Sequence, residues 1–198
     1  MKKIMMVVAA FALAVSAQAA TYNWKWTSTL KDPTSTAFSG TVYLFNAQDY
    51  SQQTILTAFL ANPSSYSLSG AIDSYATSNG KGPTTATSIA EANIGTLRVV
   101  SESEKYVDYF YAATFSSGDD NYILLTDTYN VLVQSAQNTQ LSSALSGSSV
   151  APDDTSTIQS GKVWYKGAAP EPPVIPEPTT GLLVLLGVAG LALRRRRA

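Results

Sequence analysis

Carboxylates are the side chains of this sequence with the clearest capacity for catalysis, because the chain contains no histidine and no cysteine. That absence removes the commonest general base, the Ser-His-Asp arrangement, the usual zinc sites and a thiol nucleophile. Two acids that flank a glycosidic bond can hydrolyse it, and four acids in principle converge for this purpose: Glu102, Glu104, Asp108 and Asp127. Solvated charges on strand faces and loops are the favoured interpretation, so we expect no catalytic site and no enzyme activity.

Two acidic clusters, Asp119-Asp120-Asn121 and Asp153-Asp154, offer oxygen ligands of the kind that Ca²⁺ prefers. Neither cluster follows the EF-hand spacing, and acidic residues are frequent in ordinary turns. No glycine-rich phosphate loop follows a predicted strand, and no G-x-S-x-G nucleophile motif is present. The sequence therefore predicts no metal and no cofactor.

The part of the chain between Ala20 and Pro178 is acidic, with seven basic and fourteen acidic residues and a net charge of −7. Such a body is a poor candidate for binding nucleic acid or anionic membrane surfaces. Residues 20–167 are numerous enough for one domain with a sizeable core, and we expect them to form one extracytoplasmic β-rich domain. Without cysteine, packing has to hold that domain together.

Three tryptophans, Trp24, Trp26 and Trp164, suggest an alternative role. Thr21 to Thr27 alternates aromatic residues with polar ones, which predicts a half-buried strand. An aromatic stripe of this kind packs in a core or stacks on sugar rings, and core packing is favoured. Exposed coplanar rings would indicate a carbohydrate-binding module, whereas buried rings would indicate a structural or interaction protein.

Short strands dominate the rest of the body. The strongest runs from Lys105 to Phe115, and its alternate residues Val107, Tyr109, Tyr111, Ala113 and Phe115 form one unbroken apolar face. Other predicted strands cover residues 40–46, 66–68, 96–100, 122–125, 129–133 and 157–166. Strands of this length with turn signals between them predict an antiparallel β-sandwich.

One short amphipathic helix is expected, from Asp49 to Asn62. Asp49 is the predicted cap, and Pro63 ends the helix because the residue before a proline avoids the helical region. Residues 72–78 suggest a helical turn, whereas residues 81–92 and 135–154 are small and polar and are predicted to be loops.

The N-terminus is typical of a secretory signal peptide covering residues 1–19. Lys2 and Lys3 form the basic region and residues 4–15 the apolar region. Ala17-Gln18-Ala19 is a small-x-small cleavage site, so we expect signal peptidase to cut before Ala20.

The C-terminus combines three features in order. Residues 168–178 form a proline-rich linker that ends in Pro176, Glu177 and Pro178, and residues 179–193 form an apolar segment predicted to be a short transmembrane helix. Residues 194–198 are a basic tail that should stay cytoplasmic. The basic stop consists of Arg194, Arg195, Arg196 and Arg197. The two ends together predict an exported chain held in the inner membrane by a single C-terminal anchor.

The tripeptide, the short span and the basic cluster together resemble the PEP-CTERM sorting signal of Gram-negative-type bacteria. The resemblance covers about residues 176–198 and leaves the body unrecognised. It implies processing near the tripeptide by an exosortase, a membrane-embedded Cys protease-transpeptidase. Proteins of this family have widely varying bodies and often accompany exopolysaccharide production, so exopolysaccharide is an expected partner.

The sequence therefore predicts an exported, sorted protein of the cell surface or extracellular matrix with a structural or interaction role. The alternative is a carbohydrate-binding module displayed at the same place.

Overall fold

A computed structural model describes residues 20–133, 138–153 and 155–167. The predicted signal peptide, the proline-rich linker, the predicted membrane span and the basic tail lie outside the described residues. Among the described residues, no helix has the length and apolar character needed to cross a membrane.

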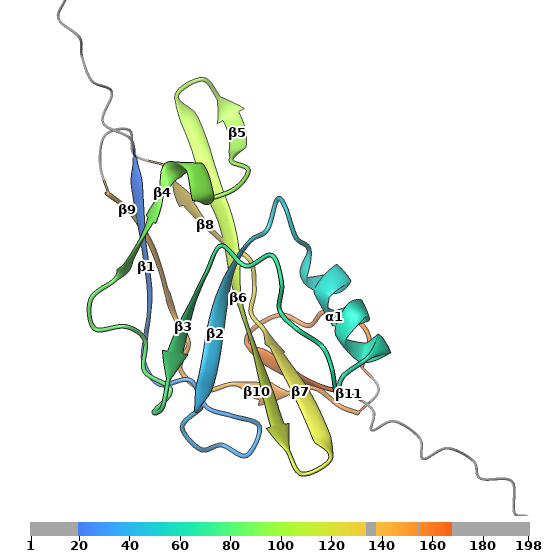
Figure 1. Cartoon of the computed structure of the whole chain (residues 1–198). Coiled ribbons are helices and arrows are strands. Elements are labelled where there is room, and N and C mark those ends of the chain that lie inside the picture. Colours follow the sequence, from blue (N-terminus) through green and yellow to red (C-terminus); the bar gives the residue numbers. More distant parts are fainter. Residues whose placement is uncertain (1–19, 134–137, 154, 168–198) are drawn as a thin grey trace, which may run out of the picture.

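The described chain is mainly β (Figure 1). Its elements, in order, are β1 (Thr21–Thr27), β2 (Gly40–Asn46), α1 (Gln52–Ala61), β3 (Asp73–Thr77), β4 (Thr87–Ala90), the 3₁₀ helix η1 (Glu91–Asn93), β5 (Arg98–Ser101), β6 (Glu104–Ser117), β7 (Asp120–Leu125), β8 (Tyr129–Leu132), β9 (Asn138–Ala144), β10 (Ser149–Val150) and β11 (Val163–Gly167). The β-rich class expected from the alternating pattern is confirmed.

The strands of the described residues form two sheets. The small sheet has the order β4-β1-β9, and the large sheet has the order β10-β11-β7-β6-β2-β3. The long strand β6 organises the large sheet, because β5 and β8 pair with its first half while β2 and β7 pair with its second half. The prediction of purely antiparallel pairing is wrong, since β9 pairs parallel with β1 and β10 pairs parallel with β11.

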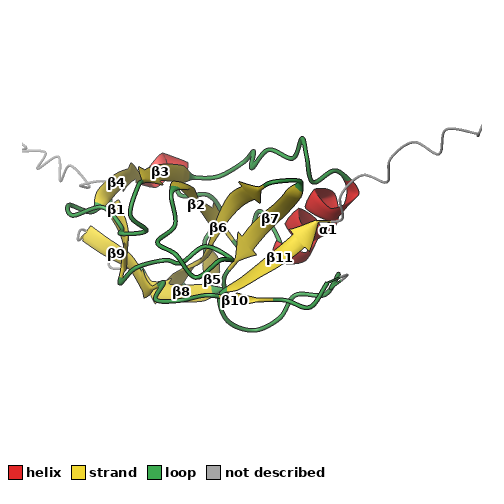
Figure 2. Ribbon diagram, turned by 90° about the horizontal axis from the view of Figure 1, so that it is seen from below, coloured by secondary structure: helices red, strands yellow, loops and turns green. Residues whose placement is uncertain are grey.

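Two hydrophobic clusters pack against opposite faces of the large sheet, which gives the domain three layers (Figure 2). The first cluster lies between the two sheets and contains Trp24 of β1 together with Tyr109 and Tyr111 of β6. The second lies under α1 and contains Phe59 of the helix and Phe110 of β6. β6 is therefore covered on both faces, which explains why Val107 to Ala113 is buried without a break.

The helix begins three residues later than predicted. Its N-cap is Ser51, whose side chain accepts a hydrogen bond from the backbone N–H of Thr54, whereas Asp49 accepts one from the N–H of Thr96. Serine and aspartate are both good caps, so the tertiary contact with Thr96 decides between them. The buried face of the helix, formed by Ile55, Leu56 and Phe59, agrees with the prediction.

Several segments that the sequence predicts to be loops are strands. Residues 72–78 contain β3 instead of a helical turn, residues 81–92 contain β4 and η1, and residues 135–154 contain β9 and β10. Conversely, residues 66–68 form no strand, and the last strand begins at Val163 rather than at residue 157. The missed strands lie at sheet edges, where few residues face the core, so their apolar periodicity is weak.

Candidate functional site

The three tryptophans are core residues. Trp24 and Trp164 are completely buried and Trp26 is 3% exposed. Each indole N–H has an internal acceptor: Trp24 donates to the Asp73 carboxylate at 2.6 Å, Trp26 to the Gly80 carbonyl at 3.0 Å, and Trp164 to the Lys31 carbonyl at 2.9 Å. Buried rings cannot stack on a sugar, so the carbohydrate platform considered for these residues is wrong.

The four carboxylates considered for catalysis do not converge. Glu102 is exposed beside the β5–β6 turn, and Glu104 accepts a hydrogen bond of 2.5 Å from the hydroxyl of Tyr106. Asp127 follows β7 and accepts a hydrogen bond of 2.7 Å from the N–H of Gly161. Only Asp108 is buried, at 6% exposure.

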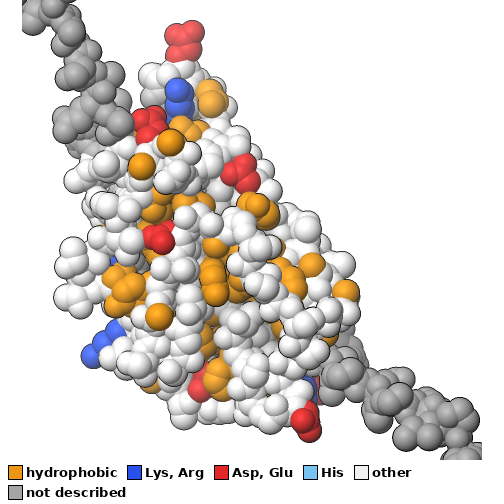
Figure 3. Space-filling model, in the orientation of Figure 1, with side chains coloured by type: hydrophobic (Ala, Val, Ile, Leu, Met, Phe, Trp, Pro, Cys, Tyr) orange, Lys and Arg blue, Asp and Glu red, His pale blue; other side chains and the backbone are white. Residues whose placement is uncertain are grey.

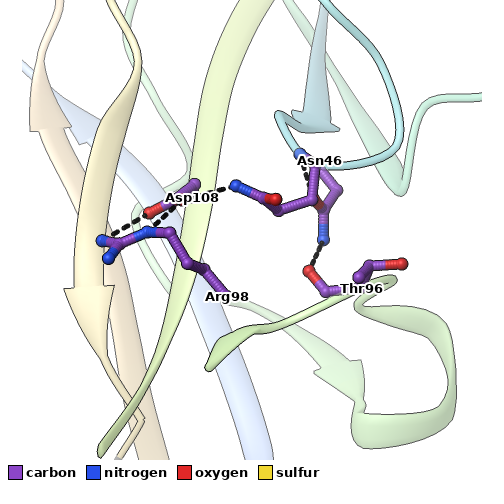
Figure 4. Close-up of polar contacts among 5 residues, drawn as sticks. Asn46, Thr96, Arg98 and Asp108 are labelled. Atoms are coloured by element: carbon purple, nitrogen blue, oxygen red, sulfur yellow. Dashed lines mark hydrogen bonds and ion pairs between the residues drawn. The ribbon is translucent and has the colours of Figure 1, made fainter. Parts of the chain in front are cut away.

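Asp108 belongs to a polar network at the junction of β2, β5 and β6 (Figure 4). Its carboxylate accepts hydrogen bonds from Nε of Arg98 at 2.7 Å, from Nη2 of Arg98 at 3.2 Å and from Nε2 of Gln48 at 2.8 Å. The Arg98 guanidinium lies over the ring of Tyr106, 4.6 Å from its centroid. Hydrogen bonding to the Asp108 carboxylate, opposed in part by burial, raises the pKa of Arg98.

Asn46 extends this network to the loop that precedes β5 (Figure 4). Its side-chain amide donates to the carbonyls of Ile94 and Thr96, both at 2.9 Å, and its oxygen accepts from the backbone N–H of Gln48 at 2.8 Å. Every polar atom of the Asn46 side chain is thus used in holding backbone. The arrangement fixes the start of β5 on the large sheet, and the three hydrogen bonds that Asp108 accepts from Arg98 and Gln48 hold its carboxylate in the same structural network.

The acidic clusters considered for calcium are also internally paired or dispersed. Asp120 forms an ion pair with Lys166 at 3.2 Å, and Asn121 accepts a hydrogen bond from Ser116 at 2.8 Å. Asp119 and Asp153 are exposed, while Asp154 lies outside the described residues. In the part of the chain that the structure describes, no three His, Cys, Asp or Glu side chains are grouped as a metal ion would need.

A polar hollow of about 220 Å³ lies beside the edge strand β3. Among its lining residues are Tyr75, Thr77, Asn79 and Lys81. Lys81 is the one charged residue in this lining, so the hollow has no pair of acids for general acid–base work. Sequence patterns did not indicate it, because the lining comes from a strand that the pattern predicted to be a helical turn.

Three exposed hydrophobic side chains lie on β5 and β8, the two strands that pair with the first half of β6. Val99 is 61% exposed, Val100 57% and Leu132 of β8 43%, and they make up three of the five large exposed hydrophobic residues described. β5 and β8 are both neighbours of β6, where Tyr106 is opposite Arg98 on one side and Leu132 on the other. On the face drawn in Figure 3, charged side chains are scattered and form no continuous patch.

The last described residue, Gly167, lies at the other end of β6. It pairs with Asn121 of β7, which pairs with Ser116 of β6. Ser116 is ten residues beyond Tyr106 in the same strand, which corresponds to about 33 Å at the usual rise of a β-strand. The exposed valines therefore lie far from the point at which the C-terminal tail begins (Figure 1).

Beyond Gly167, the comparison with known families gives a specific result. Residues 174–197 match the family model described as the PEP-CTERM protein-sorting motif. The chain carries a PEP-CTERM sorting signal. The match contains the tripeptide Pro176, Glu177 and Pro178 and all four arginines from Arg194 to Arg197. It leaves the body unrecognised.

No curated protein matches the chain, and no solved structure does. The PEP-CTERM motif implies export, a membrane-anchored transit and processing by an exosortase-type enzyme. The other predicted processing residues, Ala17 and Ala19, lie outside the described residues, whereas Ala20 is the first residue described.

Proposed function

We propose that this chain is an exported protein of the cell surface or extracellular matrix, sorted by its PEP-CTERM motif, whose body has a structural or interaction role. The observation that carries the proposal is the motif match at residues 174–197, which begins seven residues after the last strand of the β domain ends at Gly167. A non-enzymatic role is supported by the two buried carboxylates, Asp32 and Asp108, which each accept several hydrogen bonds from neighbouring residues, and by the tryptophans, which are in the core.

In this proposal, each end of the chain has its own part in export. Signal peptidase removes residues 1–19, the span at residues 179–193 holds the intermediate in the inner membrane, and the four arginines keep the extreme C-terminus inside. The proline-rich linker keeps the tripeptide away from the folded domain, because proline favours an extended chain. An exosortase-type enzyme then cuts near Pro176–Pro178 and releases the body to its final location.

The end of the domain formed by β5, β6 and β8 is the surface best suited to contact other matrix components. Val99, Val100 and Leu132 expose apolar area there, and contact with a partner would remove that area from water. Gly167, the residue from which the tail continues, lies at the opposite end of β6, so these side chains are distant from the attachment of the tail. The exposed apolar side chains and the attachment of the tail are thus at opposite ends of the domain, an arrangement that suits contact with a partner at the cell surface.

Replacing Pro176, Glu177 and Pro178 with alanines tests the sorting step in a host that encodes the exosortase-type enzyme. The span and the arginines remain, so we expect full-length protein to accumulate in the inner membrane while the wild type is processed. Fractionation followed by mass spectrometry of the C-terminus distinguishes the two. A matched triple replacement in the linker, Pro170, Glu171 and Pro172 to alanine, should be processed like the wild type.

An ordinary membrane anchor predicts equal processing of the wild type and the Pro176–Pro178 variant. That result in a host with the processing enzyme would contradict the proposal.

A further inference from the structure

The first residue after the predicted signal cleavage site contacts a carboxylate. The backbone nitrogen of Ala20 donates a hydrogen bond of 3.1 Å to Oε2 of Glu91. Ala20 is only 8% exposed, and it lies on the same buried face of the chain as Tyr22 and Trp24. A backbone N–H at this position is one residue before β1, so the contact holds the very start of the domain.

We propose that Glu91 is the receiving site for the new N-terminus that signal peptidase creates. Hydrolysis of the Ala19–Ala20 peptide bond adds one water: the hydroxyl goes to the carbonyl carbon of Ala19, and a hydrogen goes to the nitrogen of Ala20. The Ala19 acid then loses a proton, and the Ala20 amine gains one and becomes an ammonium group. The hydrogen bond from an uncharged N–H to the Glu91 carboxylate thereby becomes an ion pair between two opposite charges, which is shorter and stronger.

The surroundings of Glu91 favour this pairing. Glu91 opens η1 directly after β4, and Ala90 of β4 is opposite Thr21 of β1, so the two strands bring the carboxylate to Ala20. Within the described residues, neither of the two ion pairs between side chains involves Glu91. Its negative charge is therefore left for the N-terminus.

Tyr22 gives a second observation at the same place. Its side chain is completely buried, and its hydroxyl has no hydrogen-bond partner among the described residues. Burial raises the pKa of Tyr22, and the negative charge of Glu91 adds to the increase. The Ala20–Glu91 contact therefore lies at the start of the strand whose next inward-facing side chain is this unpartnered tyrosine.

The consequence is that cleavage strengthens the attachment of β1 at the edge of the small sheet where the strand begins. β1 is its central strand, paired with β4 on one side and β9 on the other, and the Ala20–Glu91 pair ties the start of β1 to the element that follows β4. Cleavage at another bond would move the ammonium group away from Glu91. A chain that keeps its signal peptide has only the uncharged N–H at this position.

The test compares four exported proteins recovered from the cell envelope with mild detergent. Two contain the normal cleavage site, with Glu91 or with Glu91→Gln, and two contain Gly-Ser inserted between Ala19 and Ala20, again with Glu91 or with Glu91→Gln. Mass spectrometry establishes each N-terminus, and tryptophan fluorescence gives the unfolding temperature. Glu91→Gln should lower that temperature by about 1–4 °C in the protein that begins at Ala20 and by much less in the extended protein.

Glu102→Gln, on the exposed β5–β6 turn, is the matched control and should change neither form. An equal effect of Glu91→Gln in both forms would reduce Glu91 to an ordinary hydrogen-bond acceptor and overturn the proposal. A mature N-terminus other than Ala20 would also overturn it. The inference rests on the signal cleavage of the proposed function and not on the sorting motif, because all four proteins have the same C-terminal tail.

Discussion

The guanidinium of Arg98 donates two hydrogen bonds to the carboxylate of Asp108, from Nε at 2.7 Å and from Nη2 at 3.2 Å. Arg98 is opposite Tyr106 in the β5–β6 pair, so its side chain crosses the Tyr106 ring to reach an acid two residues farther along β6. The Arg98–Asp108 pair therefore links β5 to β6 and stabilises the β5–β6 hairpin.

Asp108→Ala should destabilise the domain by about 1–3 kcal/mol, because the network loses an acceptor of three hydrogen bonds at a buried position. Urea unfolding followed by tryptophan fluorescence measures the change. Glu102→Ala is the control, since Glu102 is exposed, and its effect should stay within about 0.5 kcal/mol. Equal stability of the two variants would show that the network contributes nothing to the fold.

Alkaline pH should unfold the domain through its buried tyrosines. Burial, with a smaller contribution from Tyr129, raises the pKa of Tyr109 to about 12. The ordinary value in an unfolded chain is about 10, so the stabilisation that comes from the neutral phenol is complete below pH ~10 and is lost as the pH rises toward ~12. Tyr109→Phe cannot ionise and should shift alkaline unfolding to higher pH, as measured by phenolate absorbance and fluorescence. An unchanged midpoint in Tyr109→Phe would argue against this explanation.

Acidic pH should weaken the turn around Asp32. Burial opposes ionisation of this carboxylate, but hydrogen bonds from the hydroxyls and backbone N–H groups of Thr36 and Thr34 outweigh that effect and lower the pKa of Asp32. Its contribution is therefore present above the unfolded pKa of about 3.9 and is lost as the pH falls through the lower folded value. The stability difference between wild type and Asp32→Ala, measured by urea unfolding, should shrink as the pH falls below ~4. A constant difference would contradict the prediction.

Gly82 packs directly on Trp26. A Cβ atom at Gly82 would lie 2.3 Å from the Trp26 carbonyl oxygen and 2.9 Å from Cδ2 of its ring, so Gly82→Ala should cost about 1–3 kcal/mol through overpacking. Gly118, in the β6–β7 turn, is the comparison: it has a φ of +60° and open space around a built Cβ. Gly118→Ala should therefore cost about 1 kcal/mol through backbone strain alone and leave the tryptophan emission unchanged. A shift in tryptophan emission with Gly118→Ala but not with Gly82→Ala would contradict the prediction that Gly82, and not Gly118, packs against Trp26.

Replacing Arg194, Arg195, Arg196 and Arg197 with serine should prevent the inner membrane from retaining the anchored export intermediate. A helix over the apolar run at residues 181–193 would span only about 20 Å, less than the hydrocarbon core of about 30 Å, so we expect the arginines to be needed to hold the segment in place. Protease protection of the C-terminus in intact inner-membrane vesicles reports its side of the membrane. The Pro176–Pro178 alanine variant should keep the wild-type topology in the same assay, and loss of topology there would contradict separate roles for the tripeptide and the arginines.

The sequence by itself determined features that depend on local pattern. The PEP-CTERM motif is read from consecutive residues, and the match at residues 174–197 confirms it. β1, β2 and the long strand β6 have enough apolar residues at alternating positions to be recognised without their partners. The buried face of α1 follows in the same way from helical spacing.

Tertiary structure decided everything that depends on a partner distant in the chain. β9 lies in a Ser-rich segment with only Thr139 and Leu141 fully buried, and it is a strand because β1, more than a hundred residues earlier, supplies its parallel neighbour. Trp24 and Trp26 could have faced water on a one-sided sheet, and they are core because Tyr75 and Tyr111 of the large sheet pack against them. Asp108 could have been a solvated charge, and it is a structural acceptor because the packing of β5 and of the chain after β2 places Arg98 and Gln48 around it. The alternation of apolar and polar residues along a strand predicts that one of its faces will be buried. Only the packing of the layers determines which residues cover that face.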